Sequence, residues 1–259
     1  MSTRMERIEG LHEIASRFDG MLIDQFGVIH DGQQLYPGTP RVLSELHALK
    51  IPVAVMTNSG KRAEANRQRL VKIGVPRDHF ADAVSSGEVA FSGLTAKRAF
   101  LIGKDGEDYG FDGVTFVSDP KNAEIILILG SNAPKTSLDD YRKRLTGLTL
   151  PAICCNPDKL MLTPQGLMPA PGAIAALYEV MGGKVTWIGK PYPGIYREAA
   201  RLIGNPARIL CIGDSAEHDV AGGRNAGFST LLVLQGVSAG HDPAALSPQP
   251  DYVMDSFRW

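Results

Sequence analysis

Short apolar runs alternate with helical segments along most of this 259-residue chain, and this alternation restricts the fold more than any other feature. Such runs form the buried strands of parallel sheets, and segments such as 40–49 and 63–73 have helical periodicity. The pattern therefore predicts an α/β fold with a Rossmann-like, doubly wound parallel sheet that has helices on both faces. The predicted strands are Met21–Ile23, Pro52–Met56, Phe100–Ile102, Ile125–Leu129, Ile209–Ile212 and Thr230–Val233.

The middle of the chain has strands and helices of its own, for example Glu124–Leu129 followed by Leu138–Leu145. Long loops without secondary structure are rare in compact domains, so the sequence favours an inserted α/β domain. We expect a discontinuous core of residues 1–97 and 185–259 and an insert of residues 98–184.

Both ends of the chain carry patterns of regular structure. Asp251–Val253 resembles a final edge strand, and Trp259 is expected to be exposed. The stretch Met1–Phe18 lacks the apolar centre of a secretory signal. It is predicted to form an amphipathic helix, because apolar residues fall at helical spacing at Ile8, Leu11, Ile14 and Ala15.

Composition excludes several classes of partner. A net charge of −1 gives no reason to expect nucleic acid or an anionic membrane, and no apolar run approaches the roughly 20 residues that span a bilayer. The three cysteines, Cys154, Cys155 and Cys211, have no metal-binding spacing. We therefore expect buried, reduced thiols in a cytoplasmic protein. The oligomeric state is left open, with a homo-oligomer among the alternatives.

The first predicted strand ends in a carboxylate. Asp24 follows Gly20–Ile23 and precedes Gln25, Phe26 and Gly27. Open α/β sheets bind ligands beyond the carboxyl ends of their strands, and a carboxylate there can act as a covalent nucleophile. Many enzymes of this design have a second acid two residues later as proton donor and acceptor, and Phe26 holds that position here.

Two further strand ends carry groups that suit a phosphate. Thr57, Asn58 and Ser59 follow an apolar strand, where hydroxyl and backbone N–H groups favour an anion. The alternative is that Asn58 or Ser59 caps the next helix. Lys190 also ends an apolar run and precedes a predicted helix, 195–202, although a single lysine is usually solvated.

The strand 209–212 ends in Gly213 and Asp214, and Asp219 follows five residues later. Carboxylates at a strand end suit Mg²⁺, which takes one or two of them together with water and substrate phosphate. We predict that Asp214 is a metal ligand and that Asp219 orients the ligands around it. The alternatives are a helix cap for Asp214 and a solvated acid for Asp219.

Together these residues resemble the haloacid dehalogenase (HAD) superfamily, and the match covers nearly the whole chain. The order of Asp24, Thr57, Lys190 and the Asp214 motif is typical of that superfamily. Finer features are similar to its sugar-phosphatase and nitrophenylphosphatase branch, class IIA, which carries a large α/β cap. These features are His30–Gly32, Cys155–Asp158, Pro171–Ile174, Gly189–Pro191 and Gly222–Gly227.

The resemblance implies a Mg²⁺-dependent phosphatase that acts on small phosphorylated metabolites. Asp24 would attack phosphorus and form an aspartyl-phosphate, while Thr57 and Lys190 hold the phosphoryl group. The ion would bind the Asp24 carboxylate, the backbone carbonyl of Phe26 and Asp214. By the same resemblance, Asn156 and Asp158 lie in a cap loop that faces the substrate.

Phe26 stands where the family has the aspartate that serves as general acid and base, so this group is missing here. Losing such a group costs about 10²–10⁴-fold in rate, mostly for leaving groups that need a proton. His30 and Asp31 are the candidate replacements for this group. The alternative is that both residues simply belong to a surface turn. A rival interpretation is a regulatory protein that binds a phosphometabolite without turnover. The second rival is carbon–halogen or carbon–phosphorus cleavage at the same nucleophile.

Overall fold

The protein, described here by a computed structural model over residues 5–163 and 165–259, divides into two compact units. The first consists of the residues up to Thr57 together with Glu64–Val84 and Lys190–Trp259. The second consists of Asn58–Ala63 and Ser85–Gly189. Each unit has its own sheet and its own hydrophobic core.

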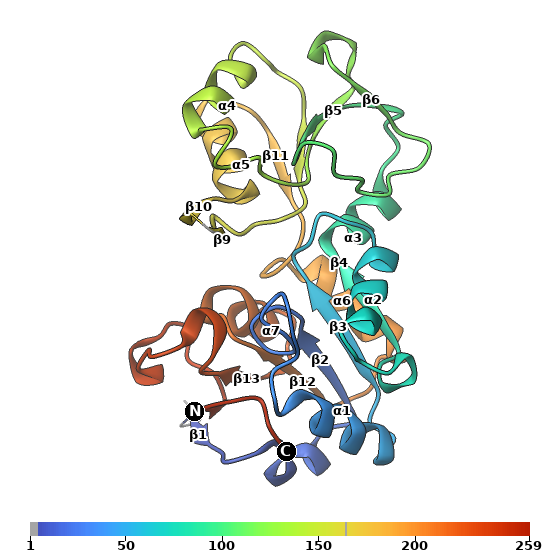
Figure 1. Ribbon diagram of the computed structural model, residues 1–259, viewed down its shortest axis with the longest axis vertical. Helices are drawn as coiled ribbons and strands as arrows, with labels where there is room; N and C mark the ends of the chain where they lie inside the picture. The colour runs from blue at the N-terminus through green and yellow to red at the C-terminus, as the bar shows by residue number, and fades with distance from the viewer. Residues whose placement is uncertain (1–4, 164) are drawn as a thin grey trace. The chain divides into compact units, whose positions relative to one another are not determined.

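The sheet of the first unit has the strand order β1-β14-β13-β12-β2-β3-β4 (Figure 1). The pairs from β1 to β3 are parallel, which confirms the predicted α/β architecture. The central strands β2 and β12 are buried along their whole length, because all their residues except Asp24 at the end of β2 are apolar or glycine and pack on both faces. The bounds are β1 Glu6–Arg7, β2 Gly20–Asp24, β3 Val53–Thr57, β4 Asp82–Ser85, β12 Ile209–Gly213, β13 Ser229–Val233 and β14 Tyr252–Met254.

Helices cover this sheet where the sequence predicted them. The helix α6 packs against β2 and β3 with its apolar residues Ile195, Tyr196 and Ala199. Its Pro193 occupies the first turn, where a missing N–H leaves no hydrogen bond unmade. The helices are α1 Thr39–Ala48, α2 Ala63–Lys72, α6 Pro193–Leu202 and α7 Ala221–Asn225, which follows a π-helical turn, η5, at Ala216–Val220.

Both chain ends differ from the sequence expectation. Instead of one amphipathic helix, the N-terminal stretch forms β1 and two 3-10 turns, Leu11–Glu13 and Ala15–Arg17; its residues 1–4 lie outside the described part. The apolar residues Ile8, Leu11, Ile14 and Ala15 are buried in the core of the first unit, although they do not belong to one helix. The strand β14 lies between β13 and β1, so it is not an edge strand. Trp259 is half-buried against the same core.

The second unit is built on a parallel sheet of order β11-β8-β7-β5-β6. The helices α4 and α5 pack against each other, and their residues Tyr141, Ile174 and Tyr178 enter the core beside Ile126 and Ile128. A two-stranded antiparallel hairpin, β9 with β10, completes the unit. The bounds are β5 Arg98–Ile102, β6 Thr115–Val117, β7 Ile125–Ile128, β8 Ala152–Cys154, β9 Leu160–Thr163, β10 Gly166–Pro169, β11 Val185–Trp187, α3 Ser86–Gly93, α4 Leu138–Leu145 and α5 Pro171–Val180.

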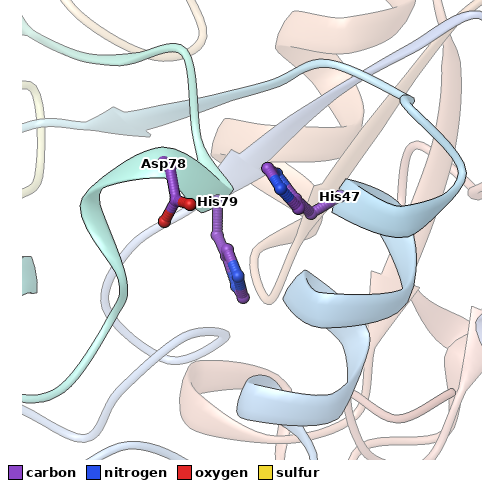
Figure 2. Close-up of side chains that lie close together, drawn as sticks. All are labelled: His47, Asp78 and His79. Carbon is purple, nitrogen blue, oxygen red and sulfur yellow. The ribbon is translucent and has the colours of Figure 1, made fainter.

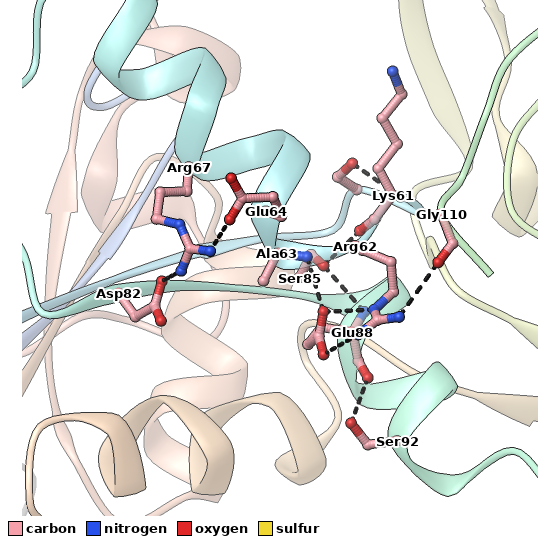
Figure 3. A network of polar contacts seen from close by, with 11 residues as sticks. Lys61, Arg62, Ala63, Glu64, Arg67, Asp82, Ser85, Glu88, Ser92 and Gly110 are labelled. Atoms are coloured by element: carbon pink, nitrogen blue, oxygen red, sulfur yellow. Dashed lines mark hydrogen bonds and ion pairs between the residues drawn. The ribbon is translucent and has the colours of Figure 1, made fainter. Parts of the chain in front are cut away.

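Polar contacts fix the segment Asn58–Ala63 within the second unit (Figure 3). The Arg62 guanidinium donates to both carboxylate oxygens of Glu88, at 2.7 and 2.9 Å, and lies 3.6 Å from the centre of the Phe91 ring. The Glu88 carboxylate also accepts the backbone N–H of Ala63 at 3.0 Å. Since α2 begins at Ala63, neither Asn58 nor Ser59 caps it, and the capping alternative for these residues is wrong.

The three cysteines are free and buried, as predicted. Burial raises the pKa of the Cys154 thiol to about 12 and raises the pKa values of the other two well above their usual range. Thiol reagents attack the thiolate, so the native protein should react negligibly at neutral pH and release three reactive thiols on unfolding. Labelling before and after denaturation checks this; rapid labelling of the native protein would contradict it.

None of the described helices is long and apolar enough to cross a membrane.

Candidate active site

Three predicted site residues end neighbouring strands of the first unit. Asp24 is the last residue of β2 and pairs with Met56, so Thr57 ends β3 one position further on. On the other side of β2, Ile23 pairs with Ile212, and Asp214 follows the last residue of β12. Parallel strands expose their carboxyl ends at one edge of the sheet, so these residues belong to the edge where such folds bind ligands.

Lys190 connects two of the carboxylates. Its Nζ donates to Asp24 Oδ1 at 2.6 Å and to Asp219 Oδ1 at 2.7 Å, and all three side chains are less than a tenth exposed. The alternatives of a solvated lysine and a solvated acid are therefore wrong for Lys190 and Asp219. Asp24 Oδ2 accepts no hydrogen bond from the described residues, which leaves this oxygen available for reaction.

Backbone groups position the other two aspartates. Asp214 Oδ2 accepts the Val237 N–H at 2.7 Å, and Asp219 Oδ2 accepts the Ser215 N–H at 3.1 Å. Asp214 therefore does not cap a helix, since the cap of the following turn is Ser215. Gly27 has φ of +93°, and a Cβ there would lie 2.0 Å from Asp214 Oδ2. Only glycine permits both that backbone conformation and the close approach of this carboxylate.

The charges of the site are unbalanced. One oxygen each of Asp24, Asp214 and Asp219 lies within 4.8 Å of the others, all three residues are buried, and Lys190 contacts Asp24 and Asp219. Burial raises the pKa of Asp24 well above its usual value, against the opposing effect of Lys190, and raises that of Asp214 to about 7. Burial alone would lower the pKa of Lys190, but Asp219 and Asp24 raise it above its usual value.

A divalent cation with a preference for oxygen fits this arrangement. Crowded, buried carboxylates with one compensating lysine would be stabilised in their ionised form by an added positive charge. Carboxylate oxygens are also the donors that Mg²⁺ prefers, usually one or two of them together with water and substrate phosphate. Asp24 and Asp214 are the residues that would hold the ion, since both oxygens of Asp219 are already hydrogen-bonded.

Replacing Lys190 with Met is expected to destabilise the protein by about 3–5 kcal/mol, because it leaves two buried carboxylates without their partner. Urea unfolding of the metal-free protein measures this. The exposed Lys72, changed to Met, is the matched control and should alter stability by less than about 0.5 kcal/mol. Similar small changes in both variants would contradict the assigned role of the lysine.

Phe26 presents its side chain and its backbone to different surroundings. The residue is 49% exposed, and its ring contacts the His30 ring edge-on, with the two ring centres 5.9 Å apart. Its carbonyl oxygen accepts no hydrogen bond from the described residues, because the neighbouring bridge uses the groups of Gln25 and Gly27 instead. The carbonyl is therefore available as a ligand, while the ring brings no group that transfers protons.

His30 is buried and held at both ring nitrogens. Its Nδ1 accepts the Gly32 N–H at 2.9 Å, so the ring proton lies on Nε2 and donates to the Gln25 amide at 3.1 Å. We assign the amide oxygen to this contact, since Gln25 Oε1 would otherwise be buried without a partner. Burial lowers the pKa of His30 to about 4. The imidazole is therefore neutral near pH 7.

Asp31 lies in an exposed turn and accepts the N–H groups of Gln33 and Gln34. These backbone hydrogen bonds lower the pKa of its carboxyl group. The surface-turn alternative describes Asp31 well, whereas His30 is buried.

The remaining candidate residues lie in the second unit. The Asn58 amide donates to Asp158 Oδ1 at 2.8 Å, and Asn156 Oδ1 accepts the Asp158 N–H at 2.9 Å. Ser59 Oγ accepts the N–H of Lys61. The structure thus brings Asn58, Asn156 and Asp158 together, although Asn58 is 98 positions before Asn156 in the sequence.

Sequence reasoning missed two groups that shape the site. Gln25 is buried between Asp24 and Phe26, and its place directly beside the predicted nucleophile was the one signal that could have drawn attention to it. The Val237 N–H positions Asp214 through the backbone, and a backbone donor leaves no trace in residue type.

Comparisons with known proteins identify the family of this chain. Residues 21–117 match the family model of haloacid dehalogenase-like hydrolases, and residues 187–259 match the HAD-hydrolase-like model; together these cover more than half of the chain. A dihydroxyacetone phosphatase of Corynebacterium glutamicum is 27% identical, with 91% of this chain and 88% of that protein covered.

Solved structures show the same fold. A haloacid dehalogenase-like hydrolase from Brucella suis is 27% identical with a TM-score of 0.85, over 96% of this chain and 99% of the other. A glycerol phosphate phosphatase from Mycobacterium tuberculosis, in complex with calcium, is 25% identical with a TM-score of 0.71, over 93% of this chain and 74% of the other.

Proposed function

Because this chain belongs to the haloacid dehalogenase-like hydrolases, we propose that it is a Mg²⁺-dependent phosphatase of small phosphate monoesters. The observation that carries the proposal is the buried contact of Lys190 with Asp24 and Asp219 at the carboxyl edge of the sheet. It supports the proposal because a carboxylate beside a positive charge can attack a phosphate that the same charge attracts. The proposed setting is cytoplasmic, with a small phosphorylated metabolite as substrate.

The first chemical step transfers the phosphoryl group to Asp24. A carboxylate oxygen of Asp24 forms a bond to phosphorus, and the bond between phosphorus and the ester oxygen breaks, which releases the alcohol or phenol. Lys190 neutralises charge on the phosphoryl oxygens, and the Thr57 hydroxyl donates to one of them. The leaving oxygen takes its proton from water, because no acidic side chain occupies position 26.

The second step restores the enzyme. Water attacks phosphorus, the bond between Asp24 and phosphorus breaks, and inorganic phosphate leaves while the proton passes to solvent. A general base speeds such a step by about 10²–10⁴-fold, and Phe26 supplies none. His30 and Asp31 remain the proposed replacements, but a neutral imidazole bound at both nitrogens and an exposed acid with a lowered pKa are weak substitutes.

The metal would supply electrostatic stabilisation of the phosphoryl oxygens in both steps. Its proposed ligands are the Asp24 and Asp214 carboxylates and the Phe26 carbonyl, while Asp219 orients Lys190 and supports the ion from outside its ligand shell. The Val237 N–H and Gly27 fix Asp214 for this role.

We propose that the second unit is the cap that selects the substrate, and that it extends beyond the 98–184 expected from the sequence to include Ser85–Gly189. The bonded group of Asn58, Asn156 and Asp158 offers amide and carboxylate groups to the non-phosphate part of a substrate. Ser59 would add a hydroxyl to the phosphate side.

The absence of a proton-transferring group at position 26 favours a second candidate function, in which the protein binds a phosphometabolite and turns it over negligibly. Phosphate release with Mg²⁺, tested on nitrophenyl phosphate and a panel of sugar, glycerol and nucleoside phosphates, separates the two. The proposed phosphatase releases phosphate from at least one of them and stops when the metal is chelated. Binding of the panel without release, by folded protein in Mg²⁺, would favour the second candidate.

A further inference from the structure

A second group of metal-binding side chains lies in the first unit, apart from the Asp24 site. His47 comes from the last turn of α1, and Asp78 and His79 come from the 3-10 turn η3, Arg77–His79 (Figure 2). One potential ligand atom from each residue lies within 4.8 Å of the others. Two segments that are about thirty residues apart in the sequence thus bring two imidazoles and one carboxylate together.

The two imidazole rings are stacked, with centres 4.8 Å apart and planes inclined by 22°. His79 Nδ1 is shielded from solvent and has no hydrogen-bond partner among the described residues. Shielded polar atoms in folded proteins nearly always have a partner, so this nitrogen is an exception. A bound cation provides the kind of partner that it lacks.

The donor set differs from that of the Asp24 site. Two imidazole nitrogens with one carboxylate suit Zn²⁺ and its first-row neighbours, whereas the three carboxylates at the sheet edge suit Mg²⁺. Three protein ligands of this kind leave one position of a zinc ion for water. The two groups would therefore select different metals from the same solution.

The backbone is fixed while the side chains have room to move. Buried Leu43 and Leu46 anchor α1 in the core, and buried Phe80 anchors the chain directly after His79. His47 and Asp78 are exposed and His79 is half-buried. Since a metal lies in the plane of each imidazole that binds it, the stacked rings must rotate about their side-chain bonds, and the exposed ring can do so without leaving a packed position.

We propose that His47, Asp78 and His79 bind a divalent transition cation of the Zn²⁺ class, which links the end of α1 to the segment before β4. The link joins two parts of the core unit that are distant in sequence. Binding to the folded state alone then raises stability in proportion to the logarithm of the metal concentration.

Zn²⁺ binding to the full chain, measured by calorimetry in excess Mg²⁺, tests the proposal. Excess Mg²⁺ competes for the carboxylate site, and the Zn²⁺ binding that is lost when a residue of the histidine group is replaced reports that group. His47→Gln and Asp78→Asn, both at exposed positions, are each expected to weaken Zn²⁺ binding by about tenfold or more. The exposed His12, changed to Gln, is the matched control and should leave it unchanged.

Thermal unfolding supplies a second readout. Zn²⁺ should raise the melting temperature of the wild type and of His12→Gln, and raise it less in the two cluster variants. The proposal is overturned if wild-type protein binds no Zn²⁺ in excess Mg²⁺, or if His47→Gln and Asp78→Asn bind it as the wild type does. Phosphatase activity enters neither readout, so failure here leaves the proposed function untouched.

Discussion

Replacing Asp24 with Asn is expected to reduce Mg²⁺-dependent phosphate release by roughly 10⁴-fold or more, the scale seen when a covalent catalytic group is removed. The amide keeps the shape of the side chain but cannot form the acyl phosphate. It also removes one of the two charges that Lys190 contacts. Initial rates on nitrophenyl phosphate, with circular dichroism to verify folding, measure the effect.

The exposed Asp112, changed to Asn, is the matched control because it makes the same chemical change on the surface of the second unit. Its rate should equal that of the wild type. A folded Asp24→Asn variant that retains a tenth or more of the activity would exclude Asp24 as the nucleophile and require another residue to react with phosphorus.

Replacing Phe26 with Asp is expected to raise kcat/KM for alkyl phosphates by about 10²–10⁴-fold, since it restores a general acid beside the leaving oxygen. The rise should be much smaller for nitrophenyl phosphate, whose phenolate leaves without a proton. The parameter kcat/KM reports the first chemical step and so separates leaving-group protonation from hydrolysis of the aspartyl-phosphate. The ring is half-exposed, so the change should alter stability little.

Phe26→Asn is the matched control for size and polarity, because it lacks only the acidic proton. It should leave both kcat/KM values near those of the wild type. Equal increases on the two substrate classes, or an increase in Phe26→Asn as large as in Phe26→Asp, would contradict the proton-transfer explanation.

The fold could be predicted because its strands are continuous apolar runs. All six predicted strands are present, and α4 was predicted over the residues it occupies. The N-terminal stretch was predicted wrongly because Ile8, Leu11, Ile14 and Ala15 satisfy helical spacing while they pack from a strand and two turns. An amphipathic helix needs apolar residues at helical spacing, but apolar residues at that spacing can also be buried by a segment that is not helical.

Parts of the candidate site followed from residue type and position at strand ends, as with Asp24 and Asp214. The contact of Lys190 with both Asp24 and Asp219 did not, because the separations of 166 and 29 residues carry no local pattern. The burial of His30 was also beyond the sequence, since a histidine before Asp31 and Gly32 has the composition of a surface turn. Tertiary packing decided both.

The most direct test of the central claim is a search for phosphate on Asp24 itself. Protein quenched in acid during turnover of nitrophenyl phosphate in Mg²⁺, then digested and analysed by mass spectrometry, should carry a phosphoryl group on the peptide that contains Asp24. Slow hydrolysis in the absence of an acid at position 26 should make this species accumulate, and Phe26→Asp should reduce it. Steady phosphate release with Asp24 unmodified, or with phosphate on another residue, would contradict the mechanism.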